Sequence, residues 1–276
     1  MKARGTIRPV VLKVGGELLD DPRKRRVMAR AIVRVAASVP LVVVHGGGRE
    51  IDAALANAQI PKRQVDGLRI TDQATLGVVV AVLAGSVNTT LVAAVNAAGG
   101  RAVGLTGADA DVCRVGRAPR HRTTTGELVD LGLVGRPVDE GPSRLVATLV
   151  RDGFVPIVAS IGAAKNGTLF NVNADTLAGS LATRLAASRL VIAGGTAGVL
   201  DESGQTIPML DRAAASDAVQ SGTISAGMVA KLSACHDALA GGVSDVIVAD
   251  GTRPPRLASL LTTARVRRGA WTQIVG

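Results

Sequence analysis

The sequence is poor in aromatic residues, cysteine and histidine. Its 276 residues include one Trp, two Phe and no Tyr, too few for the aromatic platform on which modules for single-stranded nucleic acid stack bases. The two cysteines, Cys113 and Cys235, form no CxxC pair, which argues against a disulfide framework and a zinc site. The three histidines, His45, His121 and His236, lack the spacing of a metal site. We therefore expect no resident metal and a location in the reducing cytoplasm.

Several motifs that identify nucleotide-binding and hydrolytic enzymes are also missing. The chain has no GxxxxGK[ST] loop, no GxGxxG fingerprint and no GxSxG elbow. Its longest nearly apolar stretch, residues 76–87, covers about 12 residues, whereas a membrane-spanning helix needs about 20. Lys13 interrupts the apolar stretch near the start of the chain, which argues against a signal peptide. We therefore expect no membrane partner.

Positive charge is in excess, but it is concentrated at the two ends of the chain. The formal net charge is +10, with +7 in residues 1–34, +5 in residues 253–276 and −2 in between. The basic residues of the stretch 22–37 either follow a phosphate backbone or form the solvated face of an amphipathic helix. We favour the helix, because apolar residues fall on its opposite face, and we expect no nucleic-acid partner. These basic residues are Arg23, Lys24, Arg25, Arg26, Arg30 and Arg34.

Five short apolar runs are each followed by glycine and then by a helical pattern. Strands that are buried on both faces of a parallel sheet have this near-continuous apolar character. The pattern predicts an α/β fold with a mainly parallel sheet and helices on both faces. The predicted strands are 10–12, 41–44, 155–158, 190–192 and 246–248, and the predicted helices are 22–37, 48–58, 72–97, 142–152, 174–187, 226–240 and 255–262.

Two segments stand apart from this pattern. The long helix expected at 72–97 is rich in Ala, Val and Leu, which indicates burial on most sides and a possible subunit contact, and Thr71 or Asp72 is placed to cap it. The stretch 112–136 is rich in Arg, Thr and Gly, with the arginines Arg114, Arg117, Arg120 and Arg122. We interpret this stretch as a hairpin excursion outside the core.

Glycine clusters at strand ends are the first candidate for chemistry. The sequence His45-Gly46-Gly47-Gly48 follows a predicted strand and precedes a helix. A glycine turn there exposes backbone N–H groups, and the helix N-terminus adds positive charge, so both favour an anion. The alternative is a tight turn that needs glycine only for its backbone conformation. Three consecutive glycines favour the anion site, because ligands bind at the carboxyl ends of parallel strands.

Two lysines and a polar cluster complete the candidates, and each has a structural alternative. Lys13 ends an apolar strand just before Gly15-Gly16 and points either to solvent or to an anion in the same crevice. The stretch 171–175, Asn-Val-Asn-Ala-Asp, precedes an apolar helix, so its side chains either cap that helix or grip a substrate. Lys231 lies on a predicted helix, where a lysine is usually a surface residue.

These motifs, taken in order, resemble the amino acid kinase family, and within it the branch that phosphorylates N-acetylglutamate in arginine biosynthesis. The similarity extends from about Val10 to the C-terminus. The motifs that carry it are Lys13-Val14-Gly15-Gly16, His45-Gly46-Gly47-Gly48, Gly67-Leu68-Arg69-Ile70-Thr71-Asp72, Leu83-Ala84-Gly85-Ser86-Val87-Asn88, Ala102-Val103-Gly104-Leu105-Thr106-Gly107, Asn171-Val172-Asn173-Ala174-Asp175, Gly198-Val199-Leu200-Asp201 and Gly227-Met228 with Lys231.

The resemblance implies an open αβα sandwich and transfer of the γ-phosphoryl of ATP, with Mg2+, to the γ-carboxylate of N-acetylglutamate. Residues 1–189 would form the acyl-amino-acid-binding and dimerisation lobe, and residues 190–276 the nucleotide-binding lobe. It assigns charge stabilisation in the transition state to Lys13 and Lys231, and the orientation of both lysines to Asp175. It assigns substrate contacts to Gly46, Gly47, Arg69 and Asn171. It assigns phosphate or nucleotide contacts to Gly15, Gly16, Gly194, Gly195, Gly198 and Met228.

The sequence departs from the family pattern at two places. Gly195 stands where the family usually has an aspartate, so a carboxylate expected near the nucleotide is missing, which affects ATP affinity or nucleotide choice. Only about nine residues precede the first predicted strand, whereas arginine-inhibited members carry a longer N-terminal helix that links dimers into a hexamer. We therefore expect a homodimer without arginine feedback. The rival functions are a kinase for a one-carbon-longer, aminoadipate-type acid and a weakly active regulatory relative.

Overall fold

A computed structural model describes residues 7–123, 125–138, 141–220, 226–263 and 271–276. One eight-stranded sheet forms its centre, with the strand order β14-β16-β15-β13-β1-β2-β10-β5. All neighbouring strands are parallel except β15 and β16, so the predicted mainly parallel sheet is confirmed. The strands are β1 (Val10–Val14), β2 (Leu41–His45), β5 (Ala102–Thr106), β10 (Val155–Ala159), β13 (Arg189–Gly194), β14 (Met209–Leu210), β15 (Val246–Asp250) and β16 (Trp271–Ile274).

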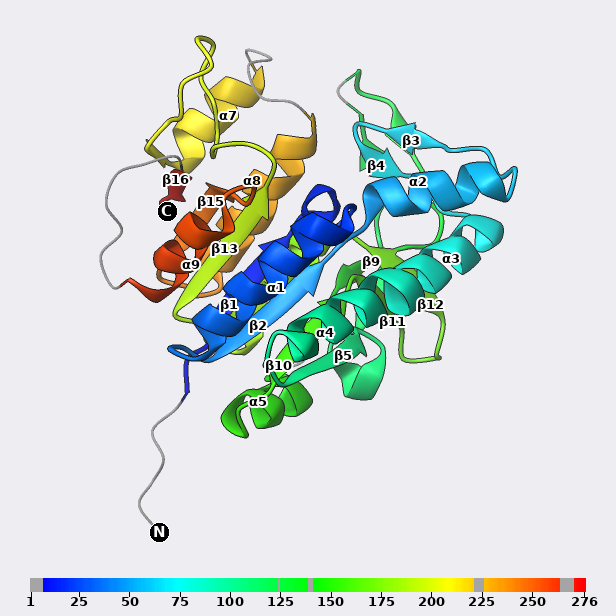
Figure 1. Cartoon of the computed structure of the whole chain (residues 1–276). Coiled ribbons are helices and arrows are strands. Elements are labelled where there is room, and N and C mark those ends of the chain that lie inside the picture. Colours follow the sequence, from blue (N-terminus) through cyan, green and yellow to red (C-terminus); the bar gives the residue numbers. More distant parts are fainter. Residues whose placement is uncertain (1–6, 124, 139–140, 221–225, 264–270) are drawn as a thin grey trace.

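Helices cover both faces of this sheet (Figure 1). On one face lie α1 (Pro22–Ala36), α4 (Asn88–Ala97) and α9 (Pro254–Thr262), and α1 contacts the other two. The opposite face carries α5 (Arg144–Arg151), α6 (Ala174–Arg184) and α8 (Ala226–Ala240). The predicted helices are confirmed to within a few residues, whereas α7 (Arg212–Gln220), the edge strands β5 and β14 and the strand β16 were not predicted.

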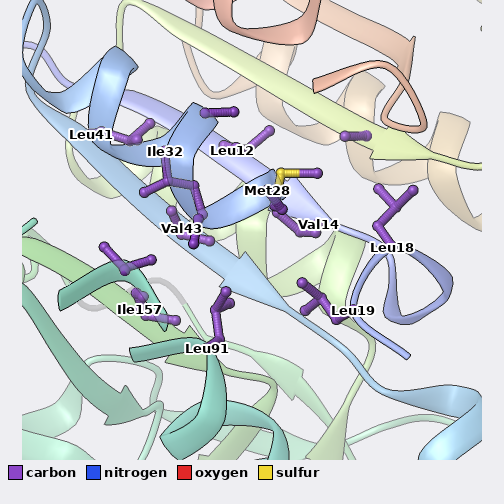
Figure 2. Close-up of a cluster of buried hydrophobic side chains, with 14 of the residues drawn as sticks. Leu12, Val14, Leu18, Leu19, Met28, Ile32, Leu41, Val43, Leu91 and Ile157 are labelled. Carbon is purple, nitrogen blue, oxygen red and sulfur yellow. The ribbon is translucent and has the colours of Figure 1, made fainter. Parts of the chain in front are cut away.

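Alternating side chains of β1 enter two separate cores. Leu12 and Val14 join the first core, where Met28 and Ile32 of α1 pack against them (Figure 2). Val11 belongs to the second core, on the side of α6. Because side chains alternate along a strand, Lys13 leaves β1 on this second side, toward α6. The strand therefore positions one charged group at the end of an otherwise apolar run.

The long helix forms as expected, with Asp72 as its cap. The Asp72 side chain accepts a hydrogen bond from the Thr75 N–H. The helix consists of α3 (Gln73–Val80), a π-helical turn (Ala81–Val87) and α4. Its 25 residues are long and apolar enough to cross a membrane by length and composition alone, and 33% of its most apolar window is buried. The expectation that no segment reaches that length was therefore wrong, because it counted only uninterrupted apolar residues.

The arginine-rich stretch 112–136 is antiparallel, as predicted, but its base belongs to the core. Strands β7 (His121–Arg122) and β8 (Leu128–Val129) pair as a hairpin. Before and after them, β6 (Val115–Arg117) and β9 (Val134–Pro137) pair in a second sheet with β11 (Ile161–Ala163) and β12 (Leu169–Val172). The prediction of an excursion outside the core is wrong for Val112, Cys113 and Val115, which are buried in the second core.

Candidate active site

Three residues that are far apart in the sequence form a charged cluster at the carboxyl edge of the sheet. Lys13 of β1 places its Nζ 2.9 Å from Oδ1 of Asp175, and Lys231 of α8 places its Nζ 3.4 Å from Oδ2. The side chains of Lys13 and Asp175 are only 8% and 6% exposed, and that of Lys231 is 24% exposed. One buried carboxylate therefore holds two ammonium groups near each other, and the Lys231 side chain is partly exposed to solvent.

The first turn of α6 explains why Asp175 is available to the lysines. The side chain of Asn173 caps the helix by accepting the N–H groups of Asp175 and Thr176, at 2.8 and 3.1 Å. The carboxylate of Asp175 is thus not used as a cap. The capping interpretation therefore holds for Asn173, and Asp175 pairs with the two lysines, whereas the predicted substrate contact of this stretch stays a prediction.

Two effects on the pKa of Asp175 oppose each other. Burial alone would raise this pKa, but the charges of Lys13 and Lys231 outweigh burial and hold it below the ordinary value of 3.8. The carboxylate is therefore ionised at neutral pH and remains a fixed anion between two cations.

The glycine turns after β1 and β2 contact each other beside this cluster. A Cβ on Gly16 would lie 2.9 Å from the Cα of Gly47, so a side chain at Gly16 would keep the two turns apart. Gly46 faces Ala174 at the start of α6. No side chain caps the helix α2 (Gly48–Asn57) at Gly47, and the N-terminus of a helix favours an anion. The structure thus brings both glycine clusters to the same edge as the lysines.

His45 is a structural residue beneath this edge, and sequence reasoning gave no role to its partner, Asn88. The ring is completely buried, and its Nδ1 lies 3.0 Å from the carbonyl oxygen of Gly46. Since a carbonyl oxygen only accepts, Nδ1 carries the proton, and Nε2 accepts from Nδ2 of Asn88 at 3.0 Å. The Nδ2 of Asn88 also donates to the carbonyl of Ile157 in the neighbouring strand, at 2.9 Å. This network ties the start of the glycine turn to β10.

The burial of His45 predicts a loss of stability in acid. Burial lowers the pKa of His45 from 6.5 to about 4, and the Gly46 carbonyl opposes this only in part. The unfolded chain therefore takes up a proton that the folded chain refuses, and the free energy of unfolding falls as pH drops from about 6.5 to about 4. The loss reaches about 1.4 kcal/mol per pH unit. Urea unfolding of wild type and His45→Gln between pH 7.5 and pH 5 measures it, and equal pH dependence in both proteins would refute the assignment.

Arg69 of β4 (Leu68–Arg69), which the resemblance assigns to the substrate, has one guanidinium nitrogen without a hydrogen-bond partner among the described residues. Its Nη2 lies 2.5 Å from Oδ1 of Asp52, while Lys62 contacts Oδ2 of the same carboxylate at 2.6 Å. Its Nη1 is buried without a hydrogen-bond partner among the described residues. A buried guanidinium N–H without a partner is costly, so this group is well suited to a ligand carboxylate. Asn171 lies on the same side, where its Nδ2 donates to Oγ1 of Thr71 at 3.2 Å.

Comparison with known proteins identifies the family. The model of the amino acid kinase family matches residues 8–250. The chain belongs to the amino acid kinase family. An acetylglutamate kinase of Sphingopyxis alaskensis is 40% identical over 224 residues, which cover 78% of this chain and 74% of that protein. An acetylglutamate kinase of Syntrophus aciditrophicus is 37% identical and covers 79% of this chain and 75% of that protein.

Solved structures of other proteins show the same amino acid kinase fold. An N-acetylglutamate synthase from Neisseria gonorrhoeae, complexed with coenzyme A and N-acetyl-glutamate, aligns with a TM-score of 0.78 at 23% identity, over 98% of this chain and 59% of that one. A carbamate kinase from Giardia lamblia bound to AMP-PNP aligns with a TM-score of 0.70 at 14% identity, over 99% of both chains. The implied α/β fold of the family is confirmed.

The residues predicted to contact the nucleotide in this amino acid kinase lie near the end of β13 and on α8. Gly194 ends β13 and Gly195 follows it, and a Cβ on Gly194 would lie 4.0 Å from Cε of Lys231. Met228 lies one turn before Lys231 on α8. Gly198 has a positive φ of 95°, and a Cβ there would lie 2.9 Å from the backbone N of Thr272, so it serves a tight turn against β16. The roles predicted for these residues stay predictions.

Glu17 is a residue that sequence reasoning missed on this side. Its Oε1 accepts a hydrogen bond from the N–H of Gly195, at 3.0 Å, across 178 residues of sequence. The aspartate that the family usually has at position 195 is absent, but a carboxylate from another loop lies against that position.

Proposed function

We propose that this chain transfers the γ-phosphoryl of ATP to the γ-carboxylate of N-acetyl-L-glutamate, which yields an acyl phosphate and ADP. The observation that carries the proposal is the buried carboxylate of Asp175, which holds Lys13 and Lys231 where the two glycine turns meet. The acetylglutamate kinases at 37–41% identity support the choice of substrate.

The reaction needs no general base. A carboxylic acid with an ordinary pKa near 4.3 is already ionised at pH 7, so its oxygen attacks phosphorus directly. The remaining task is to bring two anions together and to neutralise the charge that spreads over the transferring phosphoryl group. Lys13 and Lys231 supply two point charges, and the N–H groups of Gly16, Gly46 and Gly47 supply oriented dipoles. The N–H of Gly15 donates to the carbonyl of Ala193 at 3.0 Å, so Gly15 does not offer this group to a phosphate.

A divalent cation fits this scheme as a companion of the nucleotide. The described residues contain no group of three or more His, Cys, Asp or Glu side chains that could hold a metal ion. Mg2+ commonly keeps few protein ligands and binds phosphate oxygens and water instead. When bound with the nucleotide it would neutralise charge on the phosphates, while the transfer itself depends on the lysines.

Arg69 is expected to recognise the α-carboxylate of the acceptor through its free Nη1. Arg69→Lys keeps the charge but removes the planar fork, so the KM for N-acetylglutamate should rise by about tenfold or more while the KM for ATP stays the same. Arg117→Lys, an exposed residue paired with Asp130, is the matched control. An equal rise in both KM values would show that Arg69 supports the fold rather than the substrate.

Trapping the product tests the proposed activity and its rivals together. The protein is incubated with Mg-ATP, hydroxylamine and either N-acetylglutamate or its one-carbon-longer homologue, and the hydroxamate is measured. A pocket discriminates one methylene by about 10- to 200-fold, so N-acetylglutamate should give the larger kcat/KM by at least tenfold. A larger value with the homologue identifies the aminoadipate-type kinase. No hydroxamate with either acid refutes the kinase and favours the regulatory relative.

We also propose that the chain is a cytoplasmic homodimer that pairs through the long helix 73–97. The solvent-facing side of this helix presents small residues, among them Ala74, Gly77, Ala81 and Gly85, which allow close approach of a second helix. Light scattering should give the mass of a dimer, and Ala81→Glu should convert it to a monomer. A hexamer, or inhibition by millimolar arginine, would contradict the proposal.

A further inference from the structure

The carboxylate of Glu17 lies in a cradle made of glycine backbone. Glu17 belongs to the short 3-10 turn Gly16–Leu18 that follows β1. The N–H of Gly195 donates to its Oε1 at 3.0 Å. A Cβ on Gly15 would lie 2.5 Å from both carboxylate oxygens, and a Cβ on Gly194 would lie 3.4 Å from Oε1. Side chains at these positions would compete with the carboxylate for the cradle.

This cradle lies beside the phosphoryl-transfer cluster. The point that a Gly194 Cβ would occupy is 3.4 Å from Oε1 of Glu17 and 4.0 Å from Cε of Lys231. Within the part of the chain that the structure describes, no lysine or arginine side chain forms an ion pair with the Glu17 carboxylate. Lys24, the nearest candidate in sequence, instead contacts the backbone carbonyl of Glu17 and the side chain of Asp20.

A carboxylate in this cradle needs the same hydrogen-bond donors as a phosphate group. Backbone N–H groups of glycine turns at strand ends bind phosphate oxygens and carboxylate oxygens alike. Two anions cannot share the cradle, because unit charges about 4 Å apart repel strongly near a protein surface. The nucleotide and Glu17 are therefore alternative occupants.

The displaced side chain has a place to go. A pocket of about 450 Å³ adjoins the cradle and is lined by residues of the 3-10 turn, α1 and the start of α9. Arg23, Lys24 and Arg49 line this pocket together with Glu17 and Gly195. Lys24 and Arg49 also pair with Asp20, at 2.9 and 2.8 Å. A Glu17 carboxylate that left the cradle would therefore share these two cations with Asp20 and would also approach Arg23.

We propose that Glu17 occupies a phosphate subsite of the nucleotide, and that the nucleotide must displace it toward the basic pocket in order to bind. Glu17 thereby sets the affinity and the phosphate selectivity of the nucleotide site. The inference rests on the proposed function, because it requires a nucleotide at this edge of the sheet. It also gives a role to the carboxylate that lies against Gly195.

Calorimetric binding of ADP to wild type and Glu17→Gln, each without and with Mg2+, tests the proposal. The glutamine keeps the size of the side chain but removes the competing charge. ADP should bind Glu17→Gln about tenfold more tightly without Mg2+, which corresponds to about 1.4 kcal/mol. Adenosine, which has no phosphate, should bind both proteins equally. Glu127→Gln removes the same charge from the exposed β7–β8 hairpin and should leave the affinity for ADP unchanged.

Three results would overturn the proposal, and they are distinguishable. Equal or weaker binding of ADP to Glu17→Gln without Mg2+ shows that Glu17 does not compete with phosphate. Weaker binding only in the presence of Mg2+ shows that Glu17 contacts the metal ion of the nucleotide instead. Absence of ADP binding in wild type and both variants refutes the proposed function and this inference together, whereas the first two results leave the kinase intact.

Discussion

Lys13→Ala is expected to lower kcat for hydroxamate formation by about 100- to 1000-fold, and Lys231→Ala by a similar factor. Removal of one preorganised group that stabilises transition-state charge typically has this effect. Lys13 is the more buried of the two, and water replaces its charge less easily. Its variant should therefore lose at least as much activity as the Lys231 variant, with smaller changes in either KM.

The control for these variants is Lys165→Ala, an exposed lysine on the turn between β11 and β12. It should retain the wild-type kcat. Turnover within tenfold of wild type in Lys13→Ala or Lys231→Ala would remove that lysine from the transition-state role. Circular dichroism of each variant separates a loss of chemistry from a loss of fold.

Asp175→Asn is expected to lower both stability and kcat. It removes the carboxylate that pairs with both ammonium groups, and breaking a buried ion pair from one side typically costs about 3 kcal/mol or more. Unfolding in urea measures this loss, and the hydroxamate assay measures the drop in kcat that follows when the lysines lose their common anchor.

A second substitution distinguishes this explanation from a simple packing defect. Adding Lys13→Met to Asp175→Asn removes the unpaired buried ammonium, so the double variant should regain part of the lost stability. Additive losses in the double variant would contradict the account of Asp175 as a charge anchor. Unchanged stability of Asp175→Asn alone would contradict it as well.

The strands that are buried on both faces of the sheet could be predicted from the sequence. The strands β1, β2, β10, β13 and β15 are buried on both faces, and they read as apolar runs for that reason. The sequence of the edge strand β5 is not such an apolar run, because most of its residues are partly exposed and it contains Gly104. A Cβ on Gly104 would clash with the Asn88 side chain, so this glycine serves packing rather than a turn.

The candidate site could be predicted only in part, because its residues meet across long distances in the sequence. A lysine on a helix carries no local sign of function, and only the resemblance of several motifs in order selected Lys231. The capping role of Asn173 and the anchoring role of Asp175 could not be separated until α6 was placed beside β1. Glu17 was missed because its partner, Gly195, is 178 residues away, although the glycine at that position was recognised as a departure from the family.

Position 195 also shows what the structure adds to a departure seen in the sequence. The sequence indicates a missing carboxylate near the nucleotide, and the structure places the Glu17 carboxylate against the backbone N–H of Gly195. The predicted effect of Gly195 on ATP affinity or nucleotide choice stays a prediction, and the proposed role of Glu17 adds a second influence on the same affinity.

An oxygen-transfer experiment tests the central claim, direct attack of a carboxylate on phosphorus, most directly. N-acetylglutamate labelled with 18O in its γ-carboxylate is incubated with the protein, Mg-ATP and hydroxylamine. Hydroxylamine attacks the carbonyl carbon of the acyl phosphate, so the released phosphate retains the oxygen that bridged carbon and phosphorus. Mass spectrometry of that phosphate should find one labelled oxygen in each molecule formed with hydroxamate. Phosphate without label would show that water took the phosphoryl group, and it would contradict the account.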